Sequence, residues 1–190
     1  NKTLDFARSL KMPTCLIKNT SLPPKRLAIE IHEDLFNSKL YESLKKGEKP
    51  YVVHCSLTKQ KEFLAELKGG ARENEKLEEI RNNMLIYNSE VDDSQFDTLN
   101  DIESSWGKAP LVMTTPSITV GNSYSPKIPD FNSVWVAGSP TCIVAQTFQG
   151  HMRARTVTEN TMYFSLPTES ALKFHKNRTD IKFKILSQYD

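Results

Sequence analysis

The sequence predicts an α/β fold with a mostly parallel central sheet and helices on both faces. Short apolar runs alternate with amphipathic stretches over most of the chain, and the links between them are short. This alternation is typical of parallel sheets, whose crossover helices cover both faces. The 190 residues are 38% hydrophobic and 25% charged, which fits about one globular domain with a real core.

Composition excludes several classes of protein. No stretch approaches the roughly 18 continuous apolar residues of a membrane span, so no membrane partner is expected. The three cysteines are Cys15, Cys55 and Cys142; their number is odd and no two have Cys-x-x-Cys spacing. This usage predicts an intracellular, reducing compartment and argues against a structural zinc site. No metal ligands are expected in this chain.

The first elements follow from local patterns. Residues 26–32 (RLAIEIH) predict a strand, and a helix is expected over residues 35–44. Residues 51–56 (YVVHCS) are a β-branched and aromatic run entered through Gly47 and Pro50, which predicts a buried strand.

Two helices are expected next. Thr58 is a candidate N-cap for a helix through Lys68, and the Gly-Gly pair at residues 69–70 predicts its end. The charged residues 71–82 predict an exposed helix. Residues 84–89 (MLIYNS) then predict a second strand of this part of the chain.

The remaining elements continue the alternation. Apolar residues at helical spacing predict a helix over residues 94–106, stopped by Gly107. Pro140 is expected to begin a helix through Met152, because proline is tolerated in a first turn. A final helix is expected from Thr168. The remaining expected strands cover residues 111–115, 133–138 and 161–166.

The chain divides into three parts. Residues 1–24 are expected to be a linker or docking arm, residues 25–167 the folded domain, and residues 168–190 a helical extension. Since the chain starts with Asn1 rather than Met, we expect it to be a piece of a longer protein.

Charge is unevenly distributed along the sequence. Residues 1–60 carry 11 basic and 6 acidic side chains, residues 61–139 carry 7 and 13, and residues 140–190 carry 7 and 4. If the two basic ends meet, one face is positive and suits a phosphate-bearing partner. Evenly scattered, solvated charge is the alternative.

Several catalytic motifs are absent from the sequence. There is no Gly-x-x-x-x-Gly-Lys-Ser/Thr loop, Gly-x-Gly-x-x-Gly, Gly-x-Ser-x-Gly or His-Glu-x-x-His. The four histidines are dispersed and are expected to be structural or surface residues. The chain alone therefore has neither the usual phosphate loop nor a dinucleotide fingerprint.

Two segments carry functional information. Residues 114–125 (TTPSITVGNSYS) form a hydroxyl-rich loop after an expected strand, where α/β sheets place ligands. Residues 146–155 (QTFQGHMRAR) contain Gln149-x-x-x-Arg153-x-Arg155. Guanidinium groups suit the charge on a transferring γ-phosphoryl group, and two arginines at this spacing suit a helix end. An ordinary polar loop and a pair of surface arginines are the alternatives.

The order of these segments resembles the second RecA-like domain of superfamily 2 helicases. The residues YVVHCSLTKQKEF, TPSITVG, FNSVWVAGSPTC, FQGHMRAR and NTMYFSL carry the resemblance, which spans about residues 25–167. The pattern is most similar to the herpesvirus-type origin-binding helicases of large DNA viruses. The resemblance implies a RecA-like three-layer fold, ATP hydrolysis with Mg²⁺ in viral DNA replication, and a location in host cytoplasm, nucleus or virion.

The resemblance also implies roles for individual residues. Arg153 and Arg155 correspond to the motif VI arginines that contact the γ-phosphate of ATP, and Gln149 to the glutamine that begins this motif. The ATP and Mg²⁺ are then held mainly by an N-terminal RecA-like lobe of the same protein. Thr115, Gly121 and Ser123 correspond to motif V, and Ser56 and Thr58 to motif IV. The resemblance places Ser56, Thr58 and Thr115 near single-stranded or duplex DNA. It places Gly121 and Ser123 near the nucleotide.

The sequence departs from the family pattern at three places. Ser123 stands where many relatives carry Asp, Met152 replaces a motif VI glycine, and the second arginine comes one position early, at Arg155. Arg155 is the preferred arginine finger, with Arg153 the alternative. Two other functions remain open: a non-motor α/β nucleic-acid-binding or scaffold domain, and a small-molecule enzyme with a phosphate site in the loop of residues 114–125.

Overall fold

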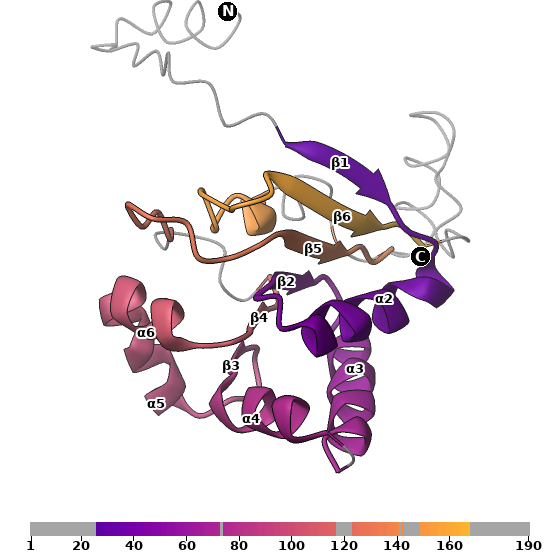
Figure 1. Cartoon of the computed structure of the whole chain (residues 1–190), viewed down its shortest axis with the longest axis horizontal. Coiled ribbons are helices and arrows are strands. Elements are labelled where there is room, and N and C mark those ends of the chain that lie inside the picture. Colours follow the sequence, from indigo (N-terminus) through magenta and orange to yellow (C-terminus); the bar gives the residue numbers. More distant parts are fainter. Residues whose placement is uncertain (1–25, 73, 117–122, 141, 143–148, 168–190) are drawn as a thin grey trace, which may run out of the picture.

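The computed structural model describes residues 26–167 except 73, 117–122, 141 and 143–148. Six parallel strands form one sheet with the order β1-β6-β5-β2-β4-β3 (Figure 1). The strands are β1 (Leu27–Glu30), β2 (Tyr51–His54), β3 (Leu85–Tyr87), β4 (Val112–Thr114), β5 (Val134–Ala137) and β6 (Thr161–Ser165). The predicted α/β class with a parallel sheet is confirmed.

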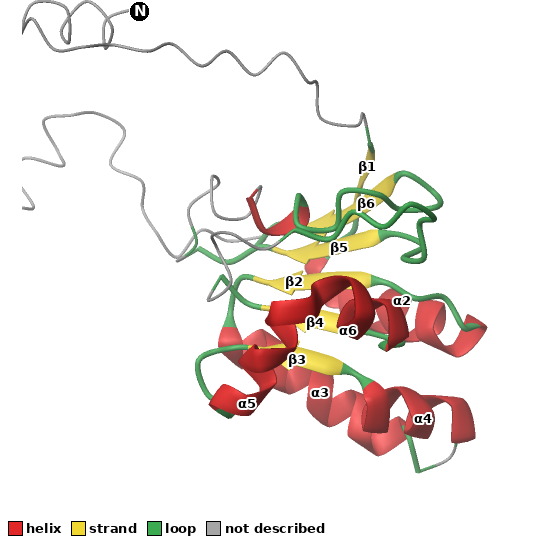
Figure 2. Cartoon of the chain, turned by 90° about the vertical axis from the view of Figure 1, so that its left-hand side faces the viewer, coloured by secondary structure: helices red, strands yellow, loops and turns green. Residues whose placement is uncertain are grey.

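Helices cover both faces of the sheet (Figure 2). One face packs against α2 (Glu33–Lys46), α3 (Leu57–Gly70) and α4 (Glu75–Asn83). The other packs against α5 (Asp93–Phe96), the 3-10 helix η1 (Asp97–Asp101) and α6 (Ile102–Lys108). Residues 149–151 are also helical and lie on this second face. The three-layer arrangement of helix, sheet and helix is therefore confirmed.

The central strand β2 shows how the sheet divides its side chains. All four of its residues are buried, as expected for a parallel strand covered on both faces. Tyr51 and Val53 belong to the core under α6, whereas Val52 belongs to the core under α2, α3 and α4. The alternation of side chains along the strand thus serves two separate cores.

The start of α3 differs from the prediction. Ser56, not Thr58, is the N-cap, and its Oγ accepts a hydrogen bond from the Lys59 backbone N–H at 3.4 Å. The helix ends at Gly70, so the predicted end at the Gly-Gly pair is confirmed, two residues beyond Lys68. A Cβ on Gly70 would overlap the Tyr41 side chain of α2. Gly70 therefore stands at the end of α3 and also allows α2 and α3 to approach closely.

The helix expected over residues 94–106 is broken into three pieces. The Asp101 side chain accepts from the Ser104 N–H at 3.1 Å and caps α6, while the Thr98 hydroxyl donates to the Gln95 carbonyl at 2.6 Å. Such side-chain hydrogen bonds to the backbone compete with a continuous helix. Helix α6 passes through Gly107 and ends before Pro110, as the restricted conformation before proline requires.

The helix expected to begin at Pro140 does not begin there. The Cys142 N–H donates to the Ser139 carbonyl at 3.1 Å, and neither Pro140 nor Cys142 is helical. Residues 141 and 143–148 of the expected helix lie outside the described part of the chain. Helical structure ends at His151, one residue before Met152. The helix expected from Thr168 lies outside the described residues. Among the residues that are described, no helix has the length and apolarity to cross a membrane.

Candidate functional site

A short β-bridge joins the two segments that the sequence singled out. Tyr124 pairs with Ala154 in parallel. The Tyr124 N–H donates to the Arg153 carbonyl at 2.7 Å, and the Arg155 N–H donates to the Tyr124 carbonyl at 2.9 Å. The end of the hydroxyl-rich loop therefore holds the backbone on both sides of Ala154. Ser123 lies directly beside this bridge.

The segment before the arginines is fixed against the central strand. A Cβ on Gly150 would lie 3.0 Å from a Val53 methyl carbon, so glycine permits the close contact. The Tyr51 hydroxyl lies 3.4 Å from the Gly150 carbonyl, to which it donates, and 3.3 Å from the Thr114 hydroxyl. The helix end that precedes Arg153 is thereby positioned by strands β2 and β4.

The two arginines differ in exposure. Arg155 is exposed, whereas Arg153 is half-buried and close enough to Tyr51 for its charge to act on the phenol. Burial raises the pKa of Tyr51, and the hydrogen bond with Thr114 and the charge of Arg153 only partly oppose this. The phenol stays neutral at physiological pH and does not cancel the positive charge of Arg153. Both arginines follow the helix end, as predicted from their spacing.

Three polar side chains that the sequence analysis did not identify support the bridge. Lys49 Nζ lies 2.7 Å from Asp130 Oδ2, which also accepts from the Tyr124 hydroxyl at 2.8 Å. Arg26 donates to the carbonyl of His151 at 3.1 Å and to the carbonyl of Ala154. The sequence signal for this framework was an aromatic residue, Tyr124, near the end of the hydroxyl-rich loop.

The predicted motif IV residues, and Thr115 of motif V, follow the carboxyl ends of the neighbouring strands β2 and β4. Ser56 is half-buried, and Thr58 is exposed in the first turn of α3. Thr115 is buried, and its N–H donates to the Tyr87 carbonyl at 2.9 Å. Helix α3 covers the opposite face from Arg153 and Arg155, so the structure does not group all predicted residues in one place.

The remaining predicted site residues differ in exposure and in whether the structure describes them. Gln149 is exposed near the helix end, and Ser123 is half-buried. Gly121 lies outside the described residues. The structure thus brings Ser123, Arg153 and Arg155 together through the Tyr124 bridge.

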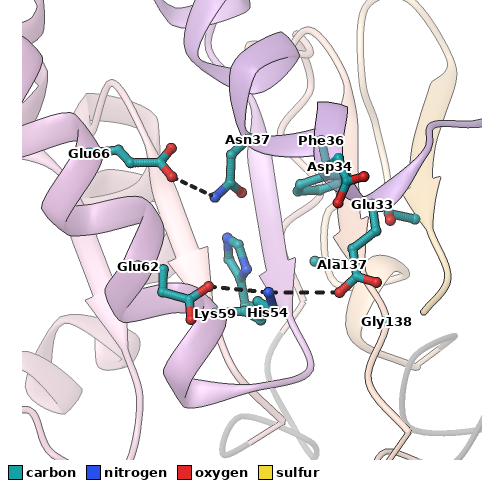
Figure 3. Close-up of a pocket in the computed structure, with 11 residues that line it drawn as sticks. Glu33, Asp34, Phe36, Asn37, His54, Lys59, Glu62, Glu66, Ala137 and Gly138 are labelled. Carbon is teal, nitrogen blue, oxygen red and sulfur yellow. Dashed lines mark hydrogen bonds and ion pairs between the residues drawn. The ribbon is translucent and has the colours of Figure 1, made fainter. Parts of the chain in front are cut away.

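A pocket of about 200 Å³ lies between α2 and α3. Strand ends β2, β5 and β6 contribute His54, Ala137, Gly138 and Ser165 to its lining. Lys59 Nζ lies 3.2 Å from Glu62 and 3.8 Å from Glu33, and so bridges the two helices (Figure 3). A second bridge joins the Asn37 amide to Glu66 at 3.4 Å. In the view of Figure 3 the His54 ring lies between these bridges.

His54 is fully buried in this wall. Its ring lies 6.1 Å from the Phe36 ring and 6.0 Å from the Phe63 ring, measured between centroids. Neither ring nitrogen has a hydrogen-bond partner within the described part of the chain. Burial lowers the pKa of His54 to about 4, so the imidazole is neutral at pH 7.

Acid is expected to destabilise the fold through His54. The unfolded histidine has a pKa of about 6.5, above the folded value of about 4, so between these values only the unfolded chain binds the proton. The stabilisation that neutral His54 gives to the folded state is complete above pH 6.5 and is lost as the pH falls toward 4. We expect the free energy of unfolding to fall by about 3 kcal/mol between pH 7 and pH 4 from this group, measured by urea denaturation.

The control for this prediction replaces the titrating ring. His54→Leu, which removes the titrating group, should flatten the pH dependence of the free energy of unfolding. An equal loss of stability in the wild type and His54→Leu would contradict the prediction.

Comparison with protein-family models and with curated proteins finds no match to this chain.

Proposed function

We propose that this chain is the second RecA-like lobe of an ATP-dependent nucleic-acid helicase that acts in viral DNA replication. The N-terminal lobe of the same protein would hold ATP and Mg²⁺, and this lobe would supply Arg155 and Arg153. The observation that carries the proposal is the bridge between Tyr124 and Ala154. It couples the segments that resemble helicase motifs V and VI, so movement of one is transmitted to the other.

The chemistry of the arginines supports this proposal. When bound, ATP would supply the phosphoryl group that is transferred to water, and Mg²⁺ would neutralise part of the phosphate charge. A guanidinium group donates several hydrogen bonds in a fixed plane, which suits the phosphoryl oxygens as their charge is redistributed. Arg155 is exposed beside a backbone held on both sides. It can therefore reach a nucleotide on another lobe without a rearrangement of the sheet.

The carboxyl edge of the sheet supports contact with a nucleic-acid strand. Helix α3 begins there, with Ser56 and Thr58 in or beside its first turn. Hydroxyl groups and the N–H groups of a helix start bind phosphate oxygens without reading the base sequence. Strand contact of this kind fits a motor that moves along DNA of any sequence.

ATP turnover tests this proposal directly. We would measure hydrolysis by the 190-residue chain and by the natural protein that contains it, with and without single-stranded DNA. The natural protein should hydrolyse ATP faster with DNA. The isolated chain should not hydrolyse ATP, because its sequence lacks a phosphate loop, but should bind DNA weakly and with strong dependence on salt.

Two outcomes would favour other functions. DNA binding by the natural protein without ATP hydrolysis would support a non-motor nucleic-acid-binding or scaffold domain. Absence of both DNA binding and ATP hydrolysis would overturn the proposal.

A further inference from the structure

The pocket between α2 and α3 lies where the chain connections change sides. After β2 the chain enters α3 on one face of the sheet, and after the neighbouring strand β5 it continues to Gly150 on the other. Adjacent parallel strands whose connections diverge leave a crevice at their carboxyl ends, and α/β proteins bind ligands in such crevices. His54 and Ala137, which end these two strands, both line the pocket.

The charge around the pocket selects the class of ligand. Its lining carries four carboxylates, from Glu33, Asp34, Glu62 and Glu66, and one ammonium group, from Lys59. Lys59 is already engaged by Glu33 and Glu62, and the hydrogen bond with Glu62 raises its pKa. The surplus negative charge disfavours a phosphate or a carboxylate inside the pocket and attracts a second cation.

His54 lines the pocket with a polar ring whose nitrogens have no hydrogen-bond partner within the described residues. A neutral imidazole presents one N–H donor and one acceptor nitrogen, and neither is satisfied within the described residues. A buried polar atom without a partner costs free energy that a ligand with N–H groups can recover. The described residues contain no group of three or more His, Cys, Asp or Glu side chains placed to hold a metal ion. An organic cation therefore fits this pocket better than a metal.

We propose that this pocket binds a primary amine or a guanidinium group, carried by a free small molecule or by a basic side chain of a partner protein. The volume of about 200 Å³ is below the usual range of pockets for drug-sized ligands and suits such a head group. The amine or guanidinium donates to the carboxylates of the lining and to the acceptor nitrogen of His54. This site is independent of the proposed motor function.

Charge variants of opposite sign test the site. Agmatine, which carries both an amine and a guanidinium, would be titrated into the full 190-residue chain at low salt, with the ring ¹⁵N signals of His54 and calorimetry as readouts. Glu62→Gln should weaken binding about threefold to fivefold, the upper end of the range for single partly exposed charge pairs. Lys59→Gln should strengthen binding by a similar factor, because it removes the competing internal cation.

Matched controls distinguish the pocket from general charge effects. Lys61→Gln removes a cation from the same helix, and Glu103→Gln removes a carboxylate on the other face; neither residue lines the pocket. Both should leave agmatine affinity within about twofold. An equal effect of Lys61→Gln and Lys59→Gln would overturn the proposal.

Two further probes settle the nature of the ligand. An acetylated Gly-Arg-Gly amide that binds more tightly than agmatine supports a protein side chain as the source, whereas tighter binding of agmatine supports a free cation. No shift of the His54 signals with either probe would overturn the proposal. Binding of inorganic phosphate that Lys59→Gln abolishes would also overturn it, since it would identify an anion site.

Discussion

Replacement of Arg155 by alanine is expected to slow ATP hydrolysis by the natural protein about 10³-fold or more, the effect typical of a lost arginine finger. ATP and single-stranded DNA should still bind, because the proposal places the phosphate loop on the N-terminal lobe and the Arg155 backbone hydrogen bond to Tyr124 does not need the side chain. Single-turnover hydrolysis, together with separate ATP and DNA binding assays, would measure this.

Further variants refine the role of the guanidinium. Arg155→Lys keeps the charge but loses the planar fork, so we expect only partial recovery of turnover. Arg153→Ala should also reduce turnover, with some loss of stability because Arg153 is half-buried near Tyr51. Lys127→Ala, an exposed cation in the same connection as Tyr124, is the matched control and should hydrolyse ATP normally. Unchanged turnover in both arginine variants would remove the finger assignment.

The second large effect is on stability, at Trp106. Its side chain is fully buried, and its Nε1 donates to the Tyr87 hydroxyl at 3.0 Å. Its ring stacks on Tyr51 with 5.3 Å between centroids and lies 5.7 Å from Tyr124. Trp106→Ala removes the centre of this aromatic cluster and should lower the free energy of unfolding by about 3–5 kcal/mol, measured by urea denaturation followed by circular dichroism.

Two comparisons make the stability prediction specific. Trp106→Phe keeps an aromatic ring but loses the hydrogen bond, so we expect a loss of about 1–2 kcal/mol. Ser104→Ala, exposed on the same helix, should change stability by less than about 0.5 kcal/mol. Because Trp106 contacts Tyr124, the alanine variant should also loosen the bridge that holds Arg153 and Arg155. Equal stability of Trp106→Ala and Ser104→Ala would contradict the core assignment.

Local patterns predicted the centres of all six strands but not their order. The run at residues 51–56 was correctly identified as a strand, because β-branched and aromatic residues bounded by glycine and proline are a local signal. The position of β5 between β2 and β6 depends on the face of the sheet over which each connecting segment crosses. Tertiary packing determines these crossings, and local sequence patterns do not reveal them.

The candidate site was predictable only in part. Arg153 and Arg155 were identified because their spacing and residue type carry a chemical signal. Their supports, Arg26 and the Lys49–Asp130 ion pair, act over more than 80 residues of sequence and give no local signal. Likewise, His54 stood out from the sequence only as one of four dispersed histidines, since its missing partners depend on how α2 and α3 pack around it.

The order of the strands bears on how the chain is made. A ribosome produces β1 first and β6 last among the described strands, yet Leu27 of β1 pairs with Thr161 of β6. The interior strand β2 likewise has both of its neighbours, β4 and β5, still to be translated. A nascent polypeptide released before residue 161 would therefore carry β1 without its sheet partner and β5 with one open edge. Such open edges are templates for aggregation. Among the described strands, the last to be translated is therefore the one that pairs with the first.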